Sequence, residues 1–325
     1  MKLVRFIPLH SYPRLPRLGA LSSDGVVDLQ HAYQLYLLEA DVCSPEAALR
    51  LSQQFLTADM VQFLENGSFS LEAAKQAMAF AETFANSEEE KVIYDKQEVR
   101  LLAPIEKPRN LRDFISFEEH IKNSRKSRDK KVPDAWYKLP VYYKGNTATI
   151  IGPDDDVVWP SYTSLLDYEL EFACIIGKQG IDIAEEEAGD YIFGYTIMND
   201  FSARDIQMQE MSVGLGPAKG KDFATALGPC IVTSDELPDP YNLKMIARVN
   251  GEVWSEGNTK TMYRPFAKII EYVSQSEPIV AGDVLGSGTV GLGCGLELGK
   301  YLNDGDIVEL EIENLGVLRN RVVKR

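Results

Sequence analysis

The last two thirds of the chain constrain the fold most, because one candidate strand follows another there with few long helical patterns between them. Short runs of β-branched and aromatic residues bounded by Gly, Asn and Asp are typical of strands. The expected strands are Ala148–Gly152, Tyr168–Gly177, Tyr191–Met198, Cys230–Ser234, Lys244–Val249, Glu252–Glu256, Ile307–Glu313 and Val317–Val323. Asn250-Gly251 predicts a type I′ hairpin, and a second hairpin is expected at Asn314–Gly316. We therefore expect a mixed or antiparallel β architecture and not a doubly wound sheet.

Residues 1–105 differ from this pattern and predict a small, partly helical N-terminal domain ahead of a catalytic domain at 106–325. A strand at Lys2–Pro8 and a hairpin around Ser23-Asp24-Gly25 are expected first, and a strand at Arg100–Pro104 closes this part. The expected helices are Leu29–Ala40, Ser44–Leu56, Ala58–Glu65 and Leu71–Asn86, the last with Ser70 as its cap. No chemical motif is evident in residues 1–105.

Composition excludes several classes of function. The 325 residues carry 34 Lys and Arg against 49 Asp and Glu, a net charge of −15, which argues against general affinity for nucleic acid or anionic membranes. Charges and prolines interrupt the N-terminus where a signal peptide needs an apolar run, and no apolar stretch approaches the ~18 residues of a membrane span. The four cysteines form no CxxC motif, so we expect reduced thiols in a cytoplasmic enzyme.

One strand carries an unusual set of acids. In Leu166–Gly177, Asp167, Glu169 and Glu171 occupy every second position, which places the three carboxylates on one face of a strand. Either this face lies in water, or Glu169 and Glu171 converge on a cation, because close carboxylates repel one another without compensation.

Two further segments carry charged residues in settings that suit a binding site. Asp200 follows an expected strand directly, so it is either a ligand at a strand end or the N-cap of the next helix, whose Arg204 and Gln207 would lie on neighbouring turns. Lys219 and Lys221 stand in a glycine-rich segment. Such lysines are usually solvated, but one beside a metal could bind a substrate carboxylate or an oxyanion.

His120 is the one histidine outside residues 1–105. The capping box Ser116-Phe117-Glu118-Glu119 predicts a helix that begins near Phe117 and holds His120 in its first turns, with Asp113 in the entry segment. The basic run 122–131 is expected to be a solvated face or a lid over an anionic substrate. Residues 286–299 are expected to form a glycine-dense loop with an exposed Thr289, whose spacing does not fit a nucleotide-binding loop.

Taken in order, these motifs resemble the fumarylacetoacetate hydrolase superfamily, and in particular its fumarylacetoacetase-like hydrolases. The resemblance spans roughly residues 105–325 and rests on DF…H, LP-x-x-Y-x-G, DYELE, NDFSARDIQ, LGP…GK-x-F and GSGT. It implies a mainly β, α+β fold, a C-terminal β-sandwich roll with a small N-terminal domain, and a homodimer.

The resemblance also implies roles for individual residues. The implied ligands of a divalent metal, Mg²⁺ or Mn²⁺ and sometimes Ca²⁺, are Asp113, Glu169, Glu171 and Asp200. The implied water-activating base is His120, with Lys221 and Gln207 stabilising oxyanion charge. Asn123 stands where many members have the glutamate that orients this histidine, and Glu297 matches the glutamate that fumarylacetoacetase uses instead. The implied substrate contacts are Tyr143, Thr289, Arg128 and Arg204. Ile115 replaces an expected tyrosine.

The expected activity is hydrolysis of a C–C bond in a β-diketo acid, an acylpyruvate or a fumarylacetoacetate-like compound, by attack of water on a metal-polarised carbonyl. The alternative on the same residues is decarboxylation of oxaloacetate, or hydration or isomerisation of a 2-keto acid. A silent metal-binding protein is a third class, which the presence of His120, Lys221 and Glu297 beside the acids disfavours.

Overall fold

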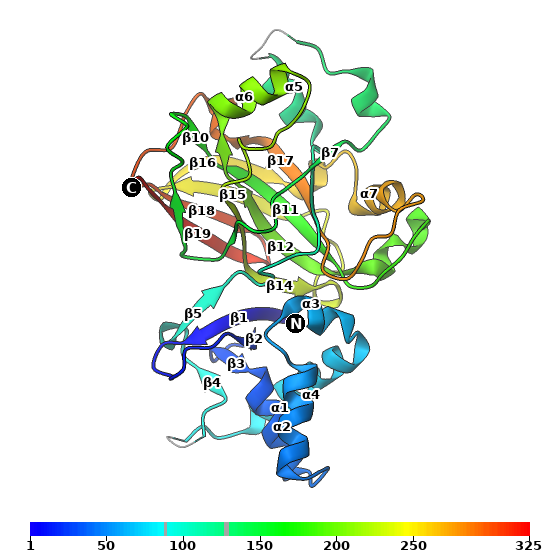
Figure 1. Ribbon diagram of the computed structural model, residues 1–325, viewed down its shortest axis with the longest axis vertical. Helices are drawn as coiled ribbons and strands as arrows, with labels where there is room; N and C mark the ends of the chain where they lie inside the picture. The colour runs from blue at the N-terminus through cyan, green and yellow to red at the C-terminus, as the bar shows by residue number, and fades with distance from the viewer. Residues whose placement is uncertain (88–89, 127–129) are drawn as a thin grey trace.

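A computed structural model describes residues 1–87, 90–126 and 130–325. It has two parts stacked along its long axis, with the N-terminal part below the larger β-rich part (Figure 1). The elements of the N-terminal part are β1 (Lys2–Pro8), β2 (Arg17–Leu21), β3 (Val26–Asp28), α1 (Leu29–Glu39), α2 (Pro45–Phe55), α3 (Met60–Glu65), α4 (Ser68–Thr83), β4 (Ile93–Tyr94), the 3₁₀ turn η1 (Lys96–Glu98) and β5 (Val99–Leu102).

The larger part contains most of the strands. Its first elements are β6 (Leu111–Phe114), α5 (Glu118–Lys126), η2 (Asp134–Tyr137), β7 (Tyr142–Lys144), β8 (Ile150–Ile151), β9 (Asp156–Val158), β10 (Leu166–Asp167), β11 (Glu169–Ile176), η3 (Glu185–Tyr191), β12 (Ile192–Asp200), β13 (Ser202–Ala203) and α6 (Arg204–Ser212). Its remaining elements are β14 (Thr225–Thr233), η4 (Ser234–Glu236), β15 (Lys244–Val249), β16 (Glu252–Asn258), η5 (Thr259–Thr261), α7 (Phe266–Val273), β17 (Val284–Cys294), α8 (Gly295–Leu298), β18 (Ile307–Ile312) and β19 (Gly316–Val323).

Two large sheets and the two-stranded ribbon β10-β13 contain the strands of the described residues. The larger has 12 strands and runs β4-β3-β2-β1-β14-β12-β11-β17-β6-β7, with β5 beside β1 and β8 beside β14. The smaller runs β16-β15-β18-β19-β9. A hydrophobic core lies between them and includes Leu170 and Phe172 of β11, Tyr168 just before this strand, and Leu310 of β18. The mainly β, mixed architecture predicted from the strand pattern is confirmed.

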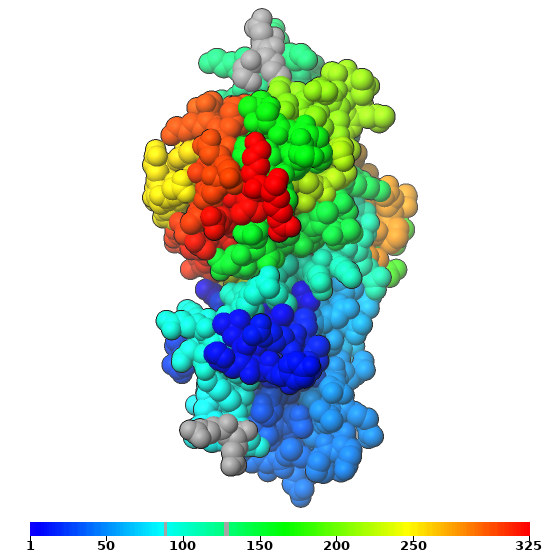
Figure 2. Space-filling model, turned by 60° about the vertical axis from the view of Figure 1, so that its left-hand side comes forward, coloured from blue at the N-terminus to red at the C-terminus, as the bar shows by residue number. Residues whose placement is uncertain are grey.

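The N-terminal part extends the large sheet. Strand β1 pairs with β14 in antiparallel register, Lys2 opposite Val232, and a second core joins α1 and α4 to Ala173 and Ile175 of β11. Because one sheet crosses both parts, the domain boundary at residue 105 stays a prediction. Figure 2 shows the N-terminal residues on the surface of the lower part and the C-terminal residues on that of the upper part.

The predicted hairpins form. Asn250 and Gly251 have φ of 51° and 81° between the paired strands β15 and β16, the left-handed geometry of a type I′ turn. The prediction for Ser70 was wrong, because α4 begins at Ser68 and the buried Ser70 hydroxyl donates to the carbonyl of Phe55. The helix predicted near Phe117 is confirmed, because α5 begins at Glu118 and holds His120 in its first turn, while Phe117 forms a bridge to Met262.

The largest error of the sequence prediction is β17. Its glycine-dense sequence was expected to be a loop, but it is an 11-residue strand between β11 and β6, and Thr289 is buried and not exposed. Glycine within a strand marks close approach by neighbours. At Gly286 an added Cβ would lie 2.5 Å from Asp113 Oδ1, so this glycine makes room for a carboxylate. Within the described residues, no helix combines the length and apolar character needed to cross a membrane.

Candidate active site

Three buried carboxylates meet above β17. One oxygen from each of Asp113, Glu169 and Glu171 lies within 4.8 Å of the others, and the residues are 6%, 5% and 0% exposed. Glu169 and Glu171 come from β11, and Asp113 comes from β6 on the other side of β17. Of the two alternatives for this face, the one in which it lies in water is therefore wrong. Their convergence is the arrangement that the alternation in sequence suggested for a cation site.

The register of the strands explains how carboxylates from separate strands meet. Gly286 of β17 pairs with Asp113 of β6, and Thr289 pairs with Glu171 of β11. The backbone N–H of Gly288 donates to Asp113 Oδ1 at 3.2 Å, and φ of 77° at Gly288 places this residue in the left-handed region. Gly286 therefore leaves space for the Asp113 carboxylate, and Gly288 lets the backbone of Phe114 and Ile115 approach closely while its N–H binds that carboxylate.

The electrostatics of the group favour a bound cation. Burial, and then the charges of Asp113 and Glu169, raise the pKa of Glu171 well above its ordinary value. Burial and the charge of Asp200 also raise the pKa of Asp113. Among the described residues, Glu171 Oε2 has no hydrogen-bond partner although it is buried. An all-oxygen donor set with an unpartnered carboxylate oxygen fits a hard divalent cation.

Lys221 supplies a positive charge on one side of this group. Its Nζ lies 2.5 Å from Glu169 Oε2 and 2.7 Å from Asp200 Oδ2, and the residue is 3% exposed. Burial alone would raise the pKa of Glu169, but the charges of Lys221 and Arg204 outweigh burial and lower it. Lys221 therefore holds Glu169 ionised.

Asp200 is engaged by its neighbours. Besides Lys221, the Tyr143 hydroxyl donates to Asp200 Oδ2 at 2.5 Å, and Thr225 donates to Oδ1. Asp200 ends β12, and the N-cap of α6 is Ala203, so Asp200 does not cap that helix. The structure places Asp200 next to Lys221 and outside the group formed by Asp113, Glu169 and Glu171.

Arg204 lies behind the carboxylates and not against the pocket where a substrate contact was expected. Its Nη2 is 2.6 Å from Asp167 Oδ2 and 2.8 Å from Glu169 Oε1, and the residue is 2% exposed. Asp167 also accepts hydrogen bonds from the backbone N–H groups of Gly295 and Leu296. The third acid of the alternating strand thus fixes Arg204 and the start of α8. It does not join the cation group.

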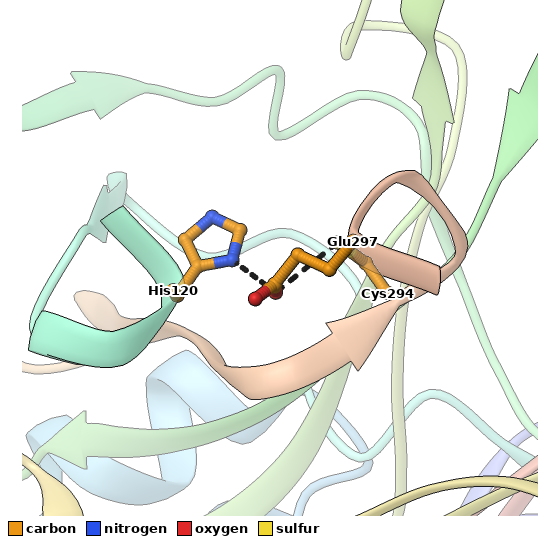
Figure 3. A group of neighbouring side chains, drawn as sticks. All are labelled: His120, Cys294 and Glu297. Atoms are coloured by element: carbon orange, nitrogen blue, oxygen red, sulfur yellow. Dashed lines mark hydrogen bonds and ion pairs between the residues drawn. The ribbon is translucent and has the colours of Figure 1, made fainter. Parts of the chain in front are cut away.

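His120 and Glu297 form a dyad at the edge of the same site. His120 Nδ1 is 2.6 Å from Glu297 Oε1 (Figure 3). The carboxylate is fixed further by Asn123 Nδ2 at 2.8 Å and the Leu292 N–H at 3.0 Å. With Nδ1 donating to a carboxylate, Nε2 is left as the basic nitrogen. The role of Asn123, which orients Glu297, is one that sequence reasoning missed.

The carboxylates and His120 line one pocket of about 280 Å³. This volume is just below the roughly 300–1,000 Å³ of pockets for drug-sized ligands, which suits a small metabolite. The pocket is lined by Asp113, Phe114, Ile115, His120, Val141, Tyr142, Tyr143, Glu169, Glu171, Gln207, Met211, Gly216, Pro217, Lys221, Gly288 and Thr289. Sequence reasoning did not identify Met211 in the apolar part of this wall.

The predicted substrate contacts are distributed unevenly over the site. Tyr143 and Thr289 line the pocket, and Thr289 Oγ1 donates to Glu171 Oε1 at 3.3 Å. Gln207 also lines the pocket, and its Oε1 accepts from Arg204 Nη1 at 2.9 Å, which leaves the amide N–H groups for a ligand. Arg128 lies outside the described residues.

Comparison with known proteins agrees with this arrangement. Residues 110–323 match the model of the fumarylacetoacetate (FAA) hydrolase C-terminal family. Oxaloacetate tautomerase FAHD2A, mitochondrial, from Homo sapiens is 36% identical over 272 residues, which are 82% of this chain and 81% of that protein. Oxaloacetate tautomerase YisK from Bacillus subtilis is 32% identical over 276 residues, 82% of this chain and 87% of that protein.

A solved structure gives the same family. Fumarylacetoacetate hydrolase (EaFAH) from psychrophilic Exiguobacterium antarcticum superposes with a TM-score of 0.72 at 29% identity, covering 100% of both chains. The family match covers well over half of this chain and includes every element that contributes to the site. The chain therefore belongs to the fumarylacetoacetate hydrolase family and is an enzyme of that superfamily.

Proposed function

We propose that this protein is a divalent-metal-dependent enzyme that interconverts the keto and enol forms of a small 2-keto acid, with oxaloacetate as the first substrate to test. The observation that carries the proposal is that a three-carboxylate group lines one small pocket together with His120, whose Nδ1 is hydrogen-bonded to Glu297 behind it. Two relatives named oxaloacetate tautomerase, each aligned over more than four fifths of both chains, support the choice of substrate. This is the isomerase alternative, and it now precedes C–C hydrolysis.

The cation would be held by Asp113, Glu169 and Glu171, and Mg²⁺ or Mn²⁺ suits these oxygen donors. When bound, it supplies Lewis-acid polarisation of the substrate carbonyl. Lys221 holds Glu169 and Asp200 in place. Arg204 also fixes Glu169, and the Tyr143 hydroxyl also fixes Asp200.

His120 performs the proton transfer in this proposal. Its Nε2 removes a proton from the carbon next to the carbonyl, while Glu297 stabilises the imidazolium through Nδ1–H. The amide of Gln207 donates to the oxygen that gains negative charge. Transfer of the proton from Nε2 to that oxygen gives the enol, and the reverse sequence gives the keto form.

C–C hydrolysis is the second candidate. The same Nε2 could deprotonate water, and the similarity to a structure named fumarylacetoacetate hydrolase favours this reaction. It differs in needing a water molecule beside His120 and a leaving enolate. Decarboxylation of oxaloacetate would need no attacking water.

The test follows the ultraviolet absorbance of enol-oxaloacetate with Mg²⁺ or EDTA, with malate dehydrogenase to trap the keto form and lactate dehydrogenase to detect pyruvate. Metal-dependent loss of enol that feeds malate dehydrogenase supports tautomerisation. Formation of pyruvate at the same rate as the loss of enol would indicate decarboxylation in place of tautomerisation. No effect on oxaloacetate, with cleavage of acetylpyruvate, fumarylpyruvate or fumarylacetoacetate, would replace it by hydrolysis.

The proposal also includes a cytoplasmic location, which the cysteines without a CxxC motif favour, and a homodimer, which the resemblance to the family implies. Light scattering coupled to size-exclusion chromatography measures the mass directly. A mass of one chain, 36.3 kDa, would remove the dimer from the proposal.

A further inference from the structure

A second group of ligating side chains lies beside the carboxylate group and has different chemistry. His120, Cys294 and Glu297 each offer one ligand atom within 4.8 Å of the other two. Glu297 Oε1 is 2.6 Å from His120 Nδ1 and 3.5 Å from Cys294 Sγ (Figure 3). The three atoms therefore already surround one point.

The fold holds these residues together from separate elements. Cys294 is the last residue of β17, and Glu297 follows three residues later in the single turn of α8, which brings both side chains to the same side. His120 comes from α5, which packs against both of these elements. Cys294 is 0% exposed and His120 is 7% exposed, and the Glu297 side chain is fully buried.

The donors differ in kind from those of the carboxylate group. A nitrogen, a sulfur and an oxygen suit Zn²⁺ and related thiolate-binding cations, whereas three carboxylates suit Mg²⁺ or Mn²⁺. Catalytic zinc sites commonly use three protein ligands and leave one position open. We propose that His120, Cys294 and Glu297 form a second, inhibitory metal site for zinc or a similar soft divalent cation.

Binding there would disable the dyad. The thiol proton of Cys294 passes to solvent, the imidazole proton moves from Nδ1 to Nε2, and Nδ1, the thiolate and the Glu297 carboxylate ligate the cation. Nε2 then carries the ring proton beside a dication, so it can no longer act as the base. Inhibition rests on the proposed role of His120, whereas the site itself depends only on the three ligands.

Cobalt(II) tests the site without any assay of turnover. We expect Co²⁺, added to EDTA-treated protein in saturating Mg²⁺, to produce the near-ultraviolet charge-transfer band of a cobalt–thiolate bond. Cys294→Ser should remove the band. Cys43→Ser is the matched control and should keep it, because Cys43 is the one partly exposed cysteine and lies in the N-terminal part. A wild-type protein without the band, or a band that survives Cys294→Ser, would overturn the site.

Zinc inhibition tests the consequence. Because the two sites share no ligand, the Zn²⁺ concentration for half-inhibition should not rise when Mg²⁺ is increased. It should rise at least about tenfold in Cys294→Ser, since even partners outside the ligand shell change metal affinity 10–100-fold. Relief by Mg²⁺ would place zinc at the carboxylates and overturn the inhibitory role. If no substrate is turned over, the proposed function fails while the cobalt band still decides the site.

Discussion

Arg204 offers the most direct test of how this site is stabilised, because one buried guanidinium pairs with two buried carboxylates. Arg204→Met removes the charge and keeps much of the volume. Removing one partner of a buried ion pair costs ~3–5 kcal/mol. Glu169 keeps Lys221 and Asp167 keeps its backbone N–H donors, so we expect the low end, about 3 kcal/mol of unfolding free energy.

The assay is urea unfolding followed by circular dichroism, in EDTA, for the wild type, Arg204→Met and a surface control. Arg319→Met is the control, because Arg319 pairs with Asp154 at 2.7 Å but the two side chains are 44% and 63% exposed. Exposed pairs contribute ~0–1 kcal/mol. Equal losses in the two variants would refute the argument from burial.

A double variant separates the lost pair from a general packing defect. Asp167→Asn removes the charge that Arg204 neutralises and keeps an acceptor for the N–H groups of α8. We expect Arg204→Met with Asp167→Asn to lose less than the sum of the single losses, with a coupling of about 1–3 kcal/mol, as for residues in direct contact. Simple additivity would contradict the pairing.

Three further outcomes are expected. Glu171→Gln removes one of three mutually repelling carboxylates, so in EDTA its melting temperature should equal or exceed that of the wild type, while isothermal titration should show at least about tenfold weaker Mg²⁺ binding. A lower melting temperature in EDTA would contradict the repulsion. His120→Asn should lower kcat by about 10²–10⁴-fold and leave Mg²⁺ affinity unchanged, because His120 is outside the carboxylate group; unchanged kcat would exclude it as the base. Gly286→Ala places a methyl group against Asp113 and Met198, so it should cost about 1–3 kcal/mol in urea unfolding and weaken Mg²⁺ binding, and normal Mg²⁺ affinity would show that Asp113 is not a ligand.

The period-2 pattern of β11 could be interpreted from sequence because it reflects local geometry. Successive side chains of a strand point to opposite faces, so Glu169 and Glu171 had to share a face, and Leu170 and Phe172 had to share the other. The hairpin at Asn250-Gly251 was predictable for the same reason, since φ above zero at both positions is a local preference of these residues.

The sequence pattern led to a wrong prediction for the β17 segment, because glycines occur both in loops and in strands that neighbours approach closely. A run such as Gly286 to Gly293 has the composition of a loop, because glycine has no side chain to pack and is depleted in strands. In the folded protein its backbone is held by β11 and β6 on both sides, and the missing side chains leave room for Asp113. Only the neighbours decide between these outcomes, and the neighbours are distant in sequence.

The sequence by itself determined the β architecture, the acidic alternation on one strand and, through its motifs, the family. Only the tertiary structure decided which acids meet. Asp167 pairs with Arg204, whereas Asp113 lies with Glu169 and Glu171. Yet Asp113 is 56 residues from Glu169 in the sequence, and Asp167 is only two residues from it. The physical reason is that strand order and the register across β17 decide which carboxylates lie together. Burial of the whole sheet fixes that register, and no local segment of the sequence encodes it.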